Sequence, residues 1–576
     1  MLESAVVVLA RRGEEATERC LSAHTASAGG GGGTRVRVSA ITACRGADLY
    51  HLLASSLMPR KRELMMKRSL VLIAAVLLAA CGNRPLKPVS PTAAARFLEQ
   101  ASFGPTPESL AQVERVGFEI YLDEQFQAPP STYDLKPTDL DVSPLQQRFF
   151  VNALTGQDQL RQRVAFALSQ IFVISANKIF DPAAFAAWLR MLSADAFGNY
   201  STLLRDVTLS PAMGTYLDMA NNDKPDPVAG TNPNENFARE ILQLFSIGPV
   251  RLNSDGSVQL DARGAPIPAY TQQTIQGFAH TFTGWTYPTR PGATPGFFDP
   301  EFYVGAMRAD DSHHDTGSKL LLRGVRLPAS QSAEKDLRDA LDNIVQDANV
   351  GPFIGLRLIQ RLVKSNPSPA YVARVADAFA DNGSRVRGDL KAVVRAILLD
   401  PEARLDTAGA AQPTDGKLRE PILFVTGFMR AFGGRSDGSE LINFTSSMQQ
   451  IPLQPPTVFN YYPPDYQVPG TRAVGPEFKL HSGPALIAKA NFVNAVISGW
   501  LRLTTTVDLS GLEPLAGDPV KLIDAIDRRL MRSMMSPAMR QALISVVASC
   551  ASDDAAGRVR AAVYLAATSS QYQVQF

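Results

Sequence analysis

The residues with the clearest capacity for acid–base chemistry lie in one run, residues 234–248. At about 100° per residue, a helix here has one wholly polar face, which includes Asn236, Arg239 and Glu240. Arg239 follows Glu235 by four residues, which is the spacing of an ion pair on one helix face. The run is therefore either a solvated surface helix or the carrier of catalytic carboxylates, with Arg239 binding an anion or tuning a carboxylate.

A second cluster, residues 310–315, places five potential metal ligands in six positions. Imidazole and carboxylate groups together suit zinc or another divalent transition metal, which needs at least three protein ligands. The same run also fits a turn in which Asp315 bonds its own backbone and Gly317 takes a positive φ. Three interpretations stay open: a turn alone, a substrate-contacting pair of His314 and Asp315, or a divalent metal site.

Aromatic residues accompany these groups. His280 lies off the apolar stripe of its expected helix, so it either faces a pocket beside Trp285 or lies at the surface. Tyr461 and Tyr462 belong to a proline-stiffened loop, whose rings either form a platform for sugars or pin the loop to the body. The sequence contains no glycine-rich phosphate loop, nucleophile elbow, CxxC pair or two-histidine zinc helix, so it indicates no standard cofactor.

Helices must position these groups, because helical periodicity dominates the sequence from residue 87 onward. Ser90 before Pro91 is an N-cap followed by a first-turn proline, which predicts a helix over residues 92–101. Strand signals are few, and residues 251–260 and 302–322 are the best hairpins. The sequence predicts a mainly α-helical, multi-helix globular body with long loops and one or two small β-hairpins. Other expected helices span residues 158–174, 182–197, 337–345, 353–364, 369–379, 390–399 and 421–431, and long loops span 223–233, 287–300, 408–415 and 451–471.

An export signal precedes the expected body. Lys67 and Arg68 come before an apolar run, residues 70–80, that is too short to cross a bilayer as a helix. The sequence Leu-Ala-Ala-Cys that ends at Cys81 resembles the bacterial lipobox, in which the cysteine is diacylated and begins the mature protein. We therefore expect lipidation at Cys81 and attachment to a membrane through this anchor.

The expected organisation has four parts. Met66 is the expected start, because an export signal belongs at the N-terminus. Gly82 stands where lipoproteins retained in the inner membrane carry an aspartate, so we expect a lipid-anchored protein of the outer membrane, in the periplasm or at the cell surface. The parts are a disordered extension at 1–65 translated from upstream of the true start, a lipoprotein signal peptide at 66–80, a tether at 81–90 and a helical body at 91–576.

Composition excludes several classes of protein. A chain with 45% hydrophobic and 19% charged residues is globular rather than disordered or a many-span membrane protein. The first 80 residues hold 11 basic and 6 acidic residues of the total 57 and 55, which leaves 46 basic and 49 acidic residues. Because this remainder has no basic stripe for phosphates, we do not expect nucleic acid as a partner. With Cys81 acylated, Cys550 would be the one cysteine left in the mature chain, so no internal disulfide is expected.

Several of these runs carry a family resemblance. Residues 234–248, 283–285 and 314–319 resemble the bacterial family called domain of unknown function 1800 (DUF1800). The resemblance implies an exported setting and a partner, because such proteins are often encoded beside exported proteins that look like sulfatases. Members often carry a histidine where this chain has Phe245, so a mechanism based on that histidine does not apply here. Further similar segments are residues 94–104, 366–371, 387–391, 419–421, 455–464 and 475–478, so the resemblance covers about residues 91–500.

Two hypotheses about function follow. The first is a hydrolase that acts on an envelope glycan or polymer through a polar pocket of Glu, Arg and His side chains. The second is a non-catalytic binding or assembly protein that works with a second exported, sulfatase-like partner. The predicted catalytic residues are Glu235, Arg239, Glu240, His314 and Asp315, and the predicted substrate-binding residues are Asn234, Asn236, His280, Trp285, Lys319, Tyr461 and Tyr462.

Overall fold

Helix capping at the start of the body follows the sequence signals. The computed structural model describes residues 88–404 and 415–576. Ser90 accepts a hydrogen bond from the backbone N–H of Ala93, with Pro91 in the first turn, and Thr106 forms a reciprocal capping box with Ser109. The expected extension at 1–65, the signal peptide at 66–80 and the lipidation site at Cys81 lie outside the described residues.

The first helices pack around α7, which contacts α4, α5, α6, α8 and α14. Almost every residue of α7 is buried, because apolar or hydrogen-bonded side chains cover its whole circumference. The expected helix at 158–174 ends early, at Ser169. The helices in this part are α4 (Pro91–Ala101), α5 (Pro107–Gln127), α6 (Ser143–Thr155), α7 (Gln159–Ser169), α8 (Pro182–Asp195), α9 (Tyr200–Thr208) and α10 (Pro211–Tyr216).

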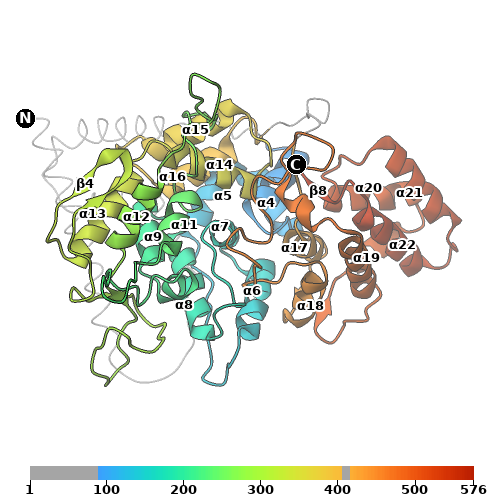
Figure 1. Ribbon diagram of the computed structural model, residues 1–576. Helices are drawn as coiled ribbons and strands as arrows, with labels where there is room; N and C mark the ends of the chain where they lie inside the picture. Colours follow the sequence, from blue (N-terminus) through green and yellow to red (C-terminus); the bar gives the residue numbers. More distant parts are fainter. Residues whose placement is uncertain (1–87, 405–414) are drawn as a thin grey trace, which may run out of the picture. The chain divides into compact units, whose positions relative to one another are not determined.

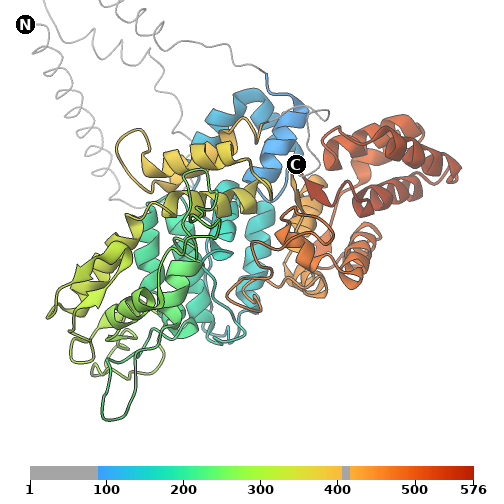
Figure 2. The ribbon, with the colours of Figure 1, turned by 45° about the horizontal axis from the view of Figure 1, so that its top comes forward.

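The remaining helices form two further groups. In Figures 1 and 2, α11 to α13 lie together in green and yellow-green, and α20 to α22 lie together in red on the other side of α7. The middle helices are α11 (Asn236–Gln243), α12 (Gln272–Thr281), α13 (Ala333–Val345), α14 (Val350–Leu362), α15 (Pro369–Ala380) and α16 (Leu390–Leu399). The later ones are α17 (Pro421–Ala431), α18 (Ser439–Ser447), α19 (Gly483–Ile497), α20 (Pro519–Leu530), α21 (Pro537–Ser549) and α22 (Ala555–Thr568), and the short 3₁₀ helices are η1 (Leu322–Gly324), η2 (Pro476–Leu480) and η3 (Ser510–Leu515).

Strands are short and pair in twos, which confirms the prediction of a mainly helical fold. Each of the four described sheets has two antiparallel strands of two residues. Two sheets join distant parts of the chain, and β8 near the C-terminus holds β5, which leads into α17. The pairs are β1 (Trp285–Thr286) with β2 (Arg308–Ala309), β3 (Lys319–Leu320) with β4 (Arg326–Leu327), β5 (Lys417–Leu418) with β8 (Val574–Gln575) and β6 (Arg435–Ser436) with β7 (Thr505–Thr506).

One of the two hairpin predictions is wrong. Residues 251–260 fold back as expected, with an antiparallel bridge between Leu252 and Val258. Residues 302–322 do not form a hairpin, because β2 pairs backward with β1 and β3 pairs forward with β4. Side chains of the segment between β2 and β3 attach it to the body. Asp311 accepts the N–H of Ala333 at the start of α13, and His314 is buried.

Buried apolar residues from α4 to α22 belong to one continuous core, in which Trp188 and Tyr200 are among the largest fully buried side chains. A core that reaches all helix groups fixes their relative positions and so positions the polar side chains between them. Within the described residues, no helix is both long enough and apolar enough to span a bilayer.

Candidate functional site

A polar contact joins α11 and α12 at the surface. Arg239 Nη2 lies 2.9 Å from Glu235 Oε2, which confirms the pairing expected from their i,i+4 spacing. Gln272 of α12 donates to the same carboxylate oxygen at 2.7 Å. Both charged side chains are partly exposed, so the pair adds little to stability and stays accessible to a ligand.

The two asparagines of α11 are bonded to other protein groups. Asn234 Oδ1 accepts the backbone N–H of Asn236, and Asn236 Nδ2 donates to Asp218 Oδ2 at 2.9 Å. Asp218 in turn pairs with Lys178 at 2.7 Å. Both asparagines are exposed, so they lie at the surface beside Glu235.

Glu240 points inward, unlike Arg239 and Asn236. Only 8% of Glu240 is exposed, and its Oε2 has no hydrogen-bond partner. Burial raises the pKa of this carboxyl, and the charge of Arg239 opposes the shift only in part. Its charge also acts on Tyr216 and Tyr270, whose pKa values rise to about 12, chiefly through burial. The expected polar face is therefore divided, because Glu240 is buried whereas Asn236 and Arg239 lie at the surface.

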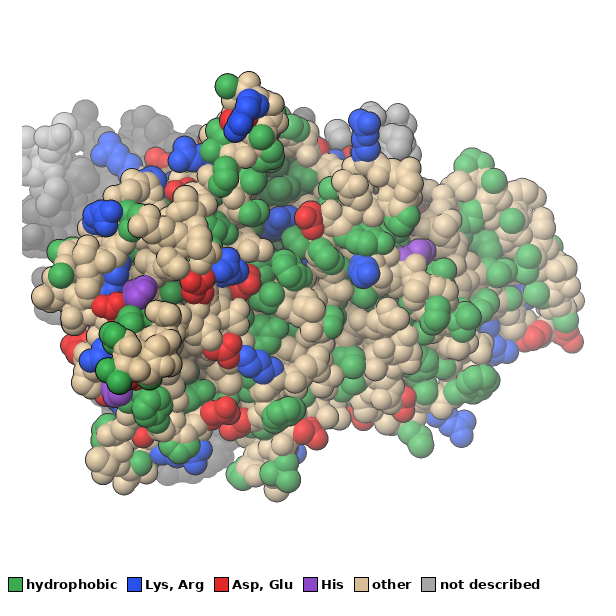
Figure 3. Space-filling view, in the orientation of Figure 1, with side chains coloured by type: hydrophobic (Ala, Val, Ile, Leu, Met, Phe, Trp, Pro, Cys, Tyr) green, Lys and Arg blue, Asp and Glu red, His purple; other side chains and the backbone are tan. Residues whose placement is uncertain are grey.

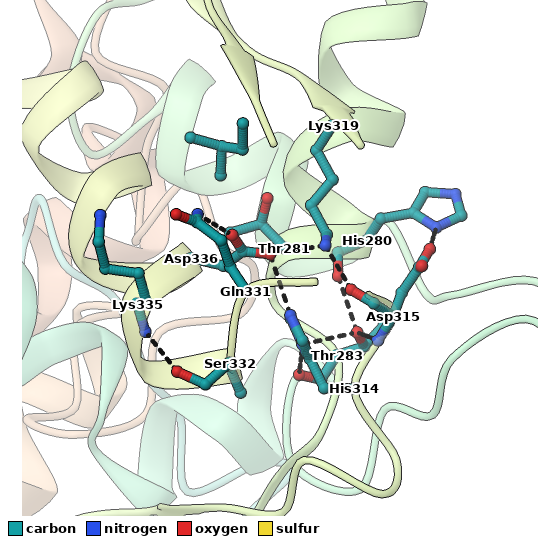
Figure 4. Close-up of polar contacts among 12 residues, drawn as sticks. His280, Thr281, Thr283, His314, Asp315, Lys319, Gln331, Ser332, Lys335 and Asp336 are labelled. Carbon is teal, nitrogen blue, oxygen red and sulfur yellow. Dashed lines mark hydrogen bonds and ion pairs between the residues drawn. The ribbon is translucent and has the colours of Figure 1, made fainter. Parts of the chain in front are cut away.

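His280 and Asp315 form an accessible acid–base pair (Figure 4). His280 Nδ1, on the last turn of α12, hydrogen-bonds Asp315 Oδ2. Asp315 is held by the N–H of Gly317 at 2.6 Å and donates its own N–H to Thr283 Oγ1 at 2.9 Å. Burial acts to raise the pKa of Asp315, but the Gly317 N–H and His280 outweigh it and hold this pKa below its ordinary value. The His280 side chain is 31% exposed, and no hydrogen bond to its Nε2 is found among the described residues.

Two glycines allow this pair to form. A Cβ on Gly277 of α12 would lie 1.9 Å from the carbonyl oxygen of Leu320, so only glycine lets β3 pack against the helix. Gly284 has φ +78°, and a Cβ there would lie 2.9 Å from the Cβ of His314. The close approach at these two positions brings the 310–319 segment onto α12, which places Asp315 beside His280.

A buried network supports the pair from behind (Figure 4). His314 Nδ1 lies 2.9 Å from the carbonyl oxygen of Thr283, and its Nε2 lies 3.0 Å from Asp336 Oδ2. Lys319 Nζ lies 2.6 Å from the same carboxylate oxygen and donates to the carbonyls of Asp315 and Gly317. All three side chains in the centre of this network are almost fully buried.

Both ring nitrogens of His314 are occupied by contacts within the protein, because Nδ1 also lies 3.2 Å from Thr283 Oγ1. Burial acts to raise the pKa of Asp336, but hydrogen bonds from His314, Lys319 and Gln331 keep it below its ordinary value. Because His314 and Lys319 are buried and their polar atoms already have partners, they do not contact substrate, which corrects the roles predicted for them.

The side chains of residues 310–315 spread in different directions. Asp310 accepts from Ser312, Asp311 caps α13, and His313 lies 3.0 Å from Asp223. His314 and Asp315 turn to separate partners, as described above. No three His, Cys, Asp or Glu side chains gather as a metal-binding group in the part of the chain that the structure describes. The arrangement favours anchoring and acid–base roles for this run over the divalent metal interpretation.

The aromatic residues predicted to bind substrate are buried. Trp285 is in β1, Tyr461 donates to the carbonyl of Ile451, and Tyr462 donates to Glu420 Oε2 at 2.8 Å. Tyr461 and Tyr462 therefore pin the loop to the body, which was the second of the two interpretations, and the burial of Trp285 argues against the substrate contact predicted for it. The exposed aromatic of the loop is Phe459.

Charged and histidine side chains gather over α12, α13 and the loops beside them, whereas hydrophobic side chains dominate the rest of this face (Figure 3). The sequence singled out several residues of this region, and Thr283 lies in a segment that carried the family resemblance, but the sequence did not indicate Gln272 or the buried Asp336. It also missed a buried centre around Glu420 and Glu477. Both glutamates lie in segments that carried the family resemblance, which was the one available signal.

These observations define the class of protein. It is a helical body with an exposed His–Asp pair, which a buried network of charged and polar side chains supports. A family model described as "Protein of unknown function (DUF1800)" matches residues 96–574, so the chain belongs to the DUF1800 family. The match extends past the expected limit near residue 500. Comparisons with curated proteins and with solved structures gave no match.

Proposed function

We propose that this protein is a hydrolase of an envelope glycan or polymer and that His280 is its general base. One observation carries the proposal: His280 has one ring nitrogen fixed on Asp315 and the other nitrogen free at the surface. A carboxylate that accepts from Nδ1–H leaves a lone pair on Nε2 and stabilises the imidazolium that forms when Nε2 takes a proton. In the proposed reaction, His280 removes a proton from water as the water attacks the scissile bond.

A second surface group favours an extended substrate. Gln272, which contacts Glu235 and Arg239, and His280 lie on the same helix. Eight residues at 1.5 Å each place them about 12 Å apart along α12. A polymer laid along this helix would contact both, with Arg239 available for an anionic group of the chain and Glu235 holding the guanidinium in place.

The assay is release of soluble fragments from purified peptidoglycan and from outer-membrane polysaccharide, measured by mass spectrometry. His280→Gln should lower the rate by about 100-fold or more, within the range of general-base catalysis. His313→Gln is the matched control, because His313 also pairs with an aspartate but its ring lies flat on Phe297, with 3.8 Å between ring centroids. Equal activity of His280→Gln and wild type on a substrate that the protein cleaves would exclude the proposed base.

We also propose that the protein is exported and anchored through a diacylated Cys81, and metabolic labelling with a fatty-acid analogue tests this. Label on the wild type and none on Cys81→Ala is the expected result. Two acyl chains hold a protein stably at a membrane. Wild type that stays bound to membranes without carrying label would refute the lipid anchor, because something other than acyl chains would then hold it there.

A binding or assembly role is the second proposal, and an exposed apolar surface favours it. Trp500 and Leu503, just after α19, are 73% and 95% exposed, and Ile487 of the same helix is also exposed. Large apolar side chains this exposed are candidate contacts for a partner, and the exported sulfatase-like protein is the partner that we propose. Trp500→Ser with Leu503→Ser should abolish crosslinking to that protein, while Val228→Ser, at another exposed apolar position, should not.

A further inference from the structure

An open pocket beside α14 is lined by two arginines and by apolar side chains. Arg357 and Arg361 lie one helical turn apart, and Phe353 precedes them on the same helix. Phe459 and Pro464 close the pocket from the 451–471 loop. The space between its walls is about 330 Å³, part of which is open to solvent. We call this feature the arginine pocket, and it is separate from the His280 site.

Arg361 connects the arginine pocket to a buried centre of charged groups. Its carbonyl oxygen accepts hydrogen bonds from Arg163 Nη2 at 2.6 Å and from Lys417 Nζ at 3.0 Å. Lys417 Nζ lies 2.9 Å from Glu477 Oε1 and 3.9 Å from Glu420 Oε1. All five side chains are buried.

Both carboxylates of this centre already have partners. Glu420 Oε2 accepts from Gln170 at 2.8 Å, from Gln450 at 2.6 Å and from Tyr462 at 2.8 Å. Glu477 pairs with Lys417. These bonds hold both acids in place, and neither has a described ion pair with Arg361.

Basic groups outnumber acidic groups here, with Arg163, Arg361 and Lys417 against two glutamates. Burial lowers the pKa of Lys417, and the two carboxylates oppose this shift. Burial lowers the pKa of Arg163 only to about 10, so it stays protonated at neutral pH. Arg357 adds a fourth cation, which the exposed Asp465 offsets in part. An uncompensated buried charge costs several kcal/mol, so an anion bound nearby would stabilise this centre.

Arg361 also has unused hydrogen-bonding capacity. Only 3% of the residue is exposed, and its buried Nη1 has no hydrogen-bond partner. Its guanidinium lies over the ring of Tyr462, 4.8 Å from the centroid, which fixes its plane. A fixed guanidinium with a free donor is the arrangement that recognises a carboxylate or a phosphate.

We propose that the arginine pocket binds a small organic anion. Its carboxylate or phosphate group accepts hydrogen bonds from Arg361 and Arg357, and its apolar part packs against Phe459 and Pro464. Arg357 is kept in position by the ring of Phe353, 5.0 Å from its guanidinium carbon, and by a 3.0 Å hydrogen bond to Gln360. The ligand thus combines one negative group with a flat or apolar body.

Calorimetric titration of the full chain at low ionic strength tests this inference, with sodium phosphate and sodium benzoate as probes. At least one anion should bind with one site per chain. Arg357→Gln should weaken binding by at least about tenfold, since hydrogen bonds to charged groups are worth about 1.5–3 kcal/mol. Arg263→Gln is the control, because Arg263 pairs with Asp261 on an exposed loop.

Two further variants sharpen the result. Arg361→Met should abolish binding, and if that variant does not fold, Arg357→Gln alone decides. Phe459→Ala should weaken benzoate and leave phosphate unchanged, which distinguishes an aromatic carboxylate from a phosphate group. Wild-type protein that binds neither anion, or Arg357→Gln protein that binds as wild type does, would overturn the proposal.

Discussion

The buried network of His314, Lys319 and Asp336 lies beneath the His280 site. It predicts that a single substitution has a large effect on stability. Asp336→Asn keeps the shape of the side chain but removes its charge. Lys319 would then be a buried cation whose remaining hydrogen bonds go to backbone carbonyls. Removing one partner of a buried ion pair costs about 3–5 kcal/mol, and we expect the free energy of unfolding to fall by this amount at neutral pH.

A double-mutant cycle in urea tests the cause of this loss. Lys319→Met alone should also destabilise, because Asp336 would lose its 2.6 Å ion pair. The double variant, Lys319→Met with Asp336→Asn, should cost less than the sum of the two, with a coupling of about 2–3 kcal/mol. Circular dichroism followed against urea concentration gives the four stabilities.

The effect of pH has a defined sign. Because the folded-state pKa of Asp336 lies below its ordinary value of 3.8, its contribution is present above pH 3.8 and is lost as pH falls through the folded-state pKa. The Asp336→Asn variant should therefore lose less stability than wild type in strong acid. A cost below about 1 kcal/mol at neutral pH, or additivity within about 0.5 kcal/mol, would refute this account of the network.

Three other predictions follow from the same region. Glu240→Gln should stabilise the protein at pH 8 but not at pH 4, because burial raises the folded-state pKa of Glu240 and ionisation above its ordinary 4.5 costs stability; urea midpoints at the two pH values measure this, and equal shifts would contradict it. The ring N–H of His314 that bonds Asp336 should exchange slowly with solvent in NMR, because both side chains are buried, and exchange as fast as that of an exposed histidine would contradict this. Gly277→Ala should destabilise the protein by about 1–3 kcal/mol through the clash with Leu320. Gly264→Ala is in open space, so it should destabilise the protein less, through the strain of its positive φ alone.

Much of the helical framework could be predicted from local pattern. The helices at 390–399 and 421–431 have the expected ends, because Asp389 caps the first and proline begins the second. The later helices α20 to α22 were not assigned individually. These three helices pack against one another as well as against α17 and α19. Their apolar residues therefore do not follow the simple pattern of a helix with one buried face.

The candidate site likewise has contacts that the sequence predicts and contacts that it does not. The Glu235–Arg239 pair depends on spacing within one helix and was predictable. The His280–Asp315 pair depends on how β3 packs on α12, and no local pattern encodes that contact. Burial of His314 and Tyr462 was also hidden, because the sequence shows the polarity of a side chain but not the distant partner that satisfies it, such as Asp336 or Glu420.

The pairing of β5 with β8 sets an order on biosynthesis. Lys417 is in β5, and its partner Gln575 is synthesised 158 residues later. Gln575 also donates to the carbonyl of Leu362 at 2.8 Å, at the end of α14. The segment that carries Lys417 therefore cannot reach its final position until β8 has been made, although N-terminal parts generally fold first. The buried charges behind the arginine pocket thus stay exposed until β8 pairs with β5, and a chain truncated before β8 would present them to proteases.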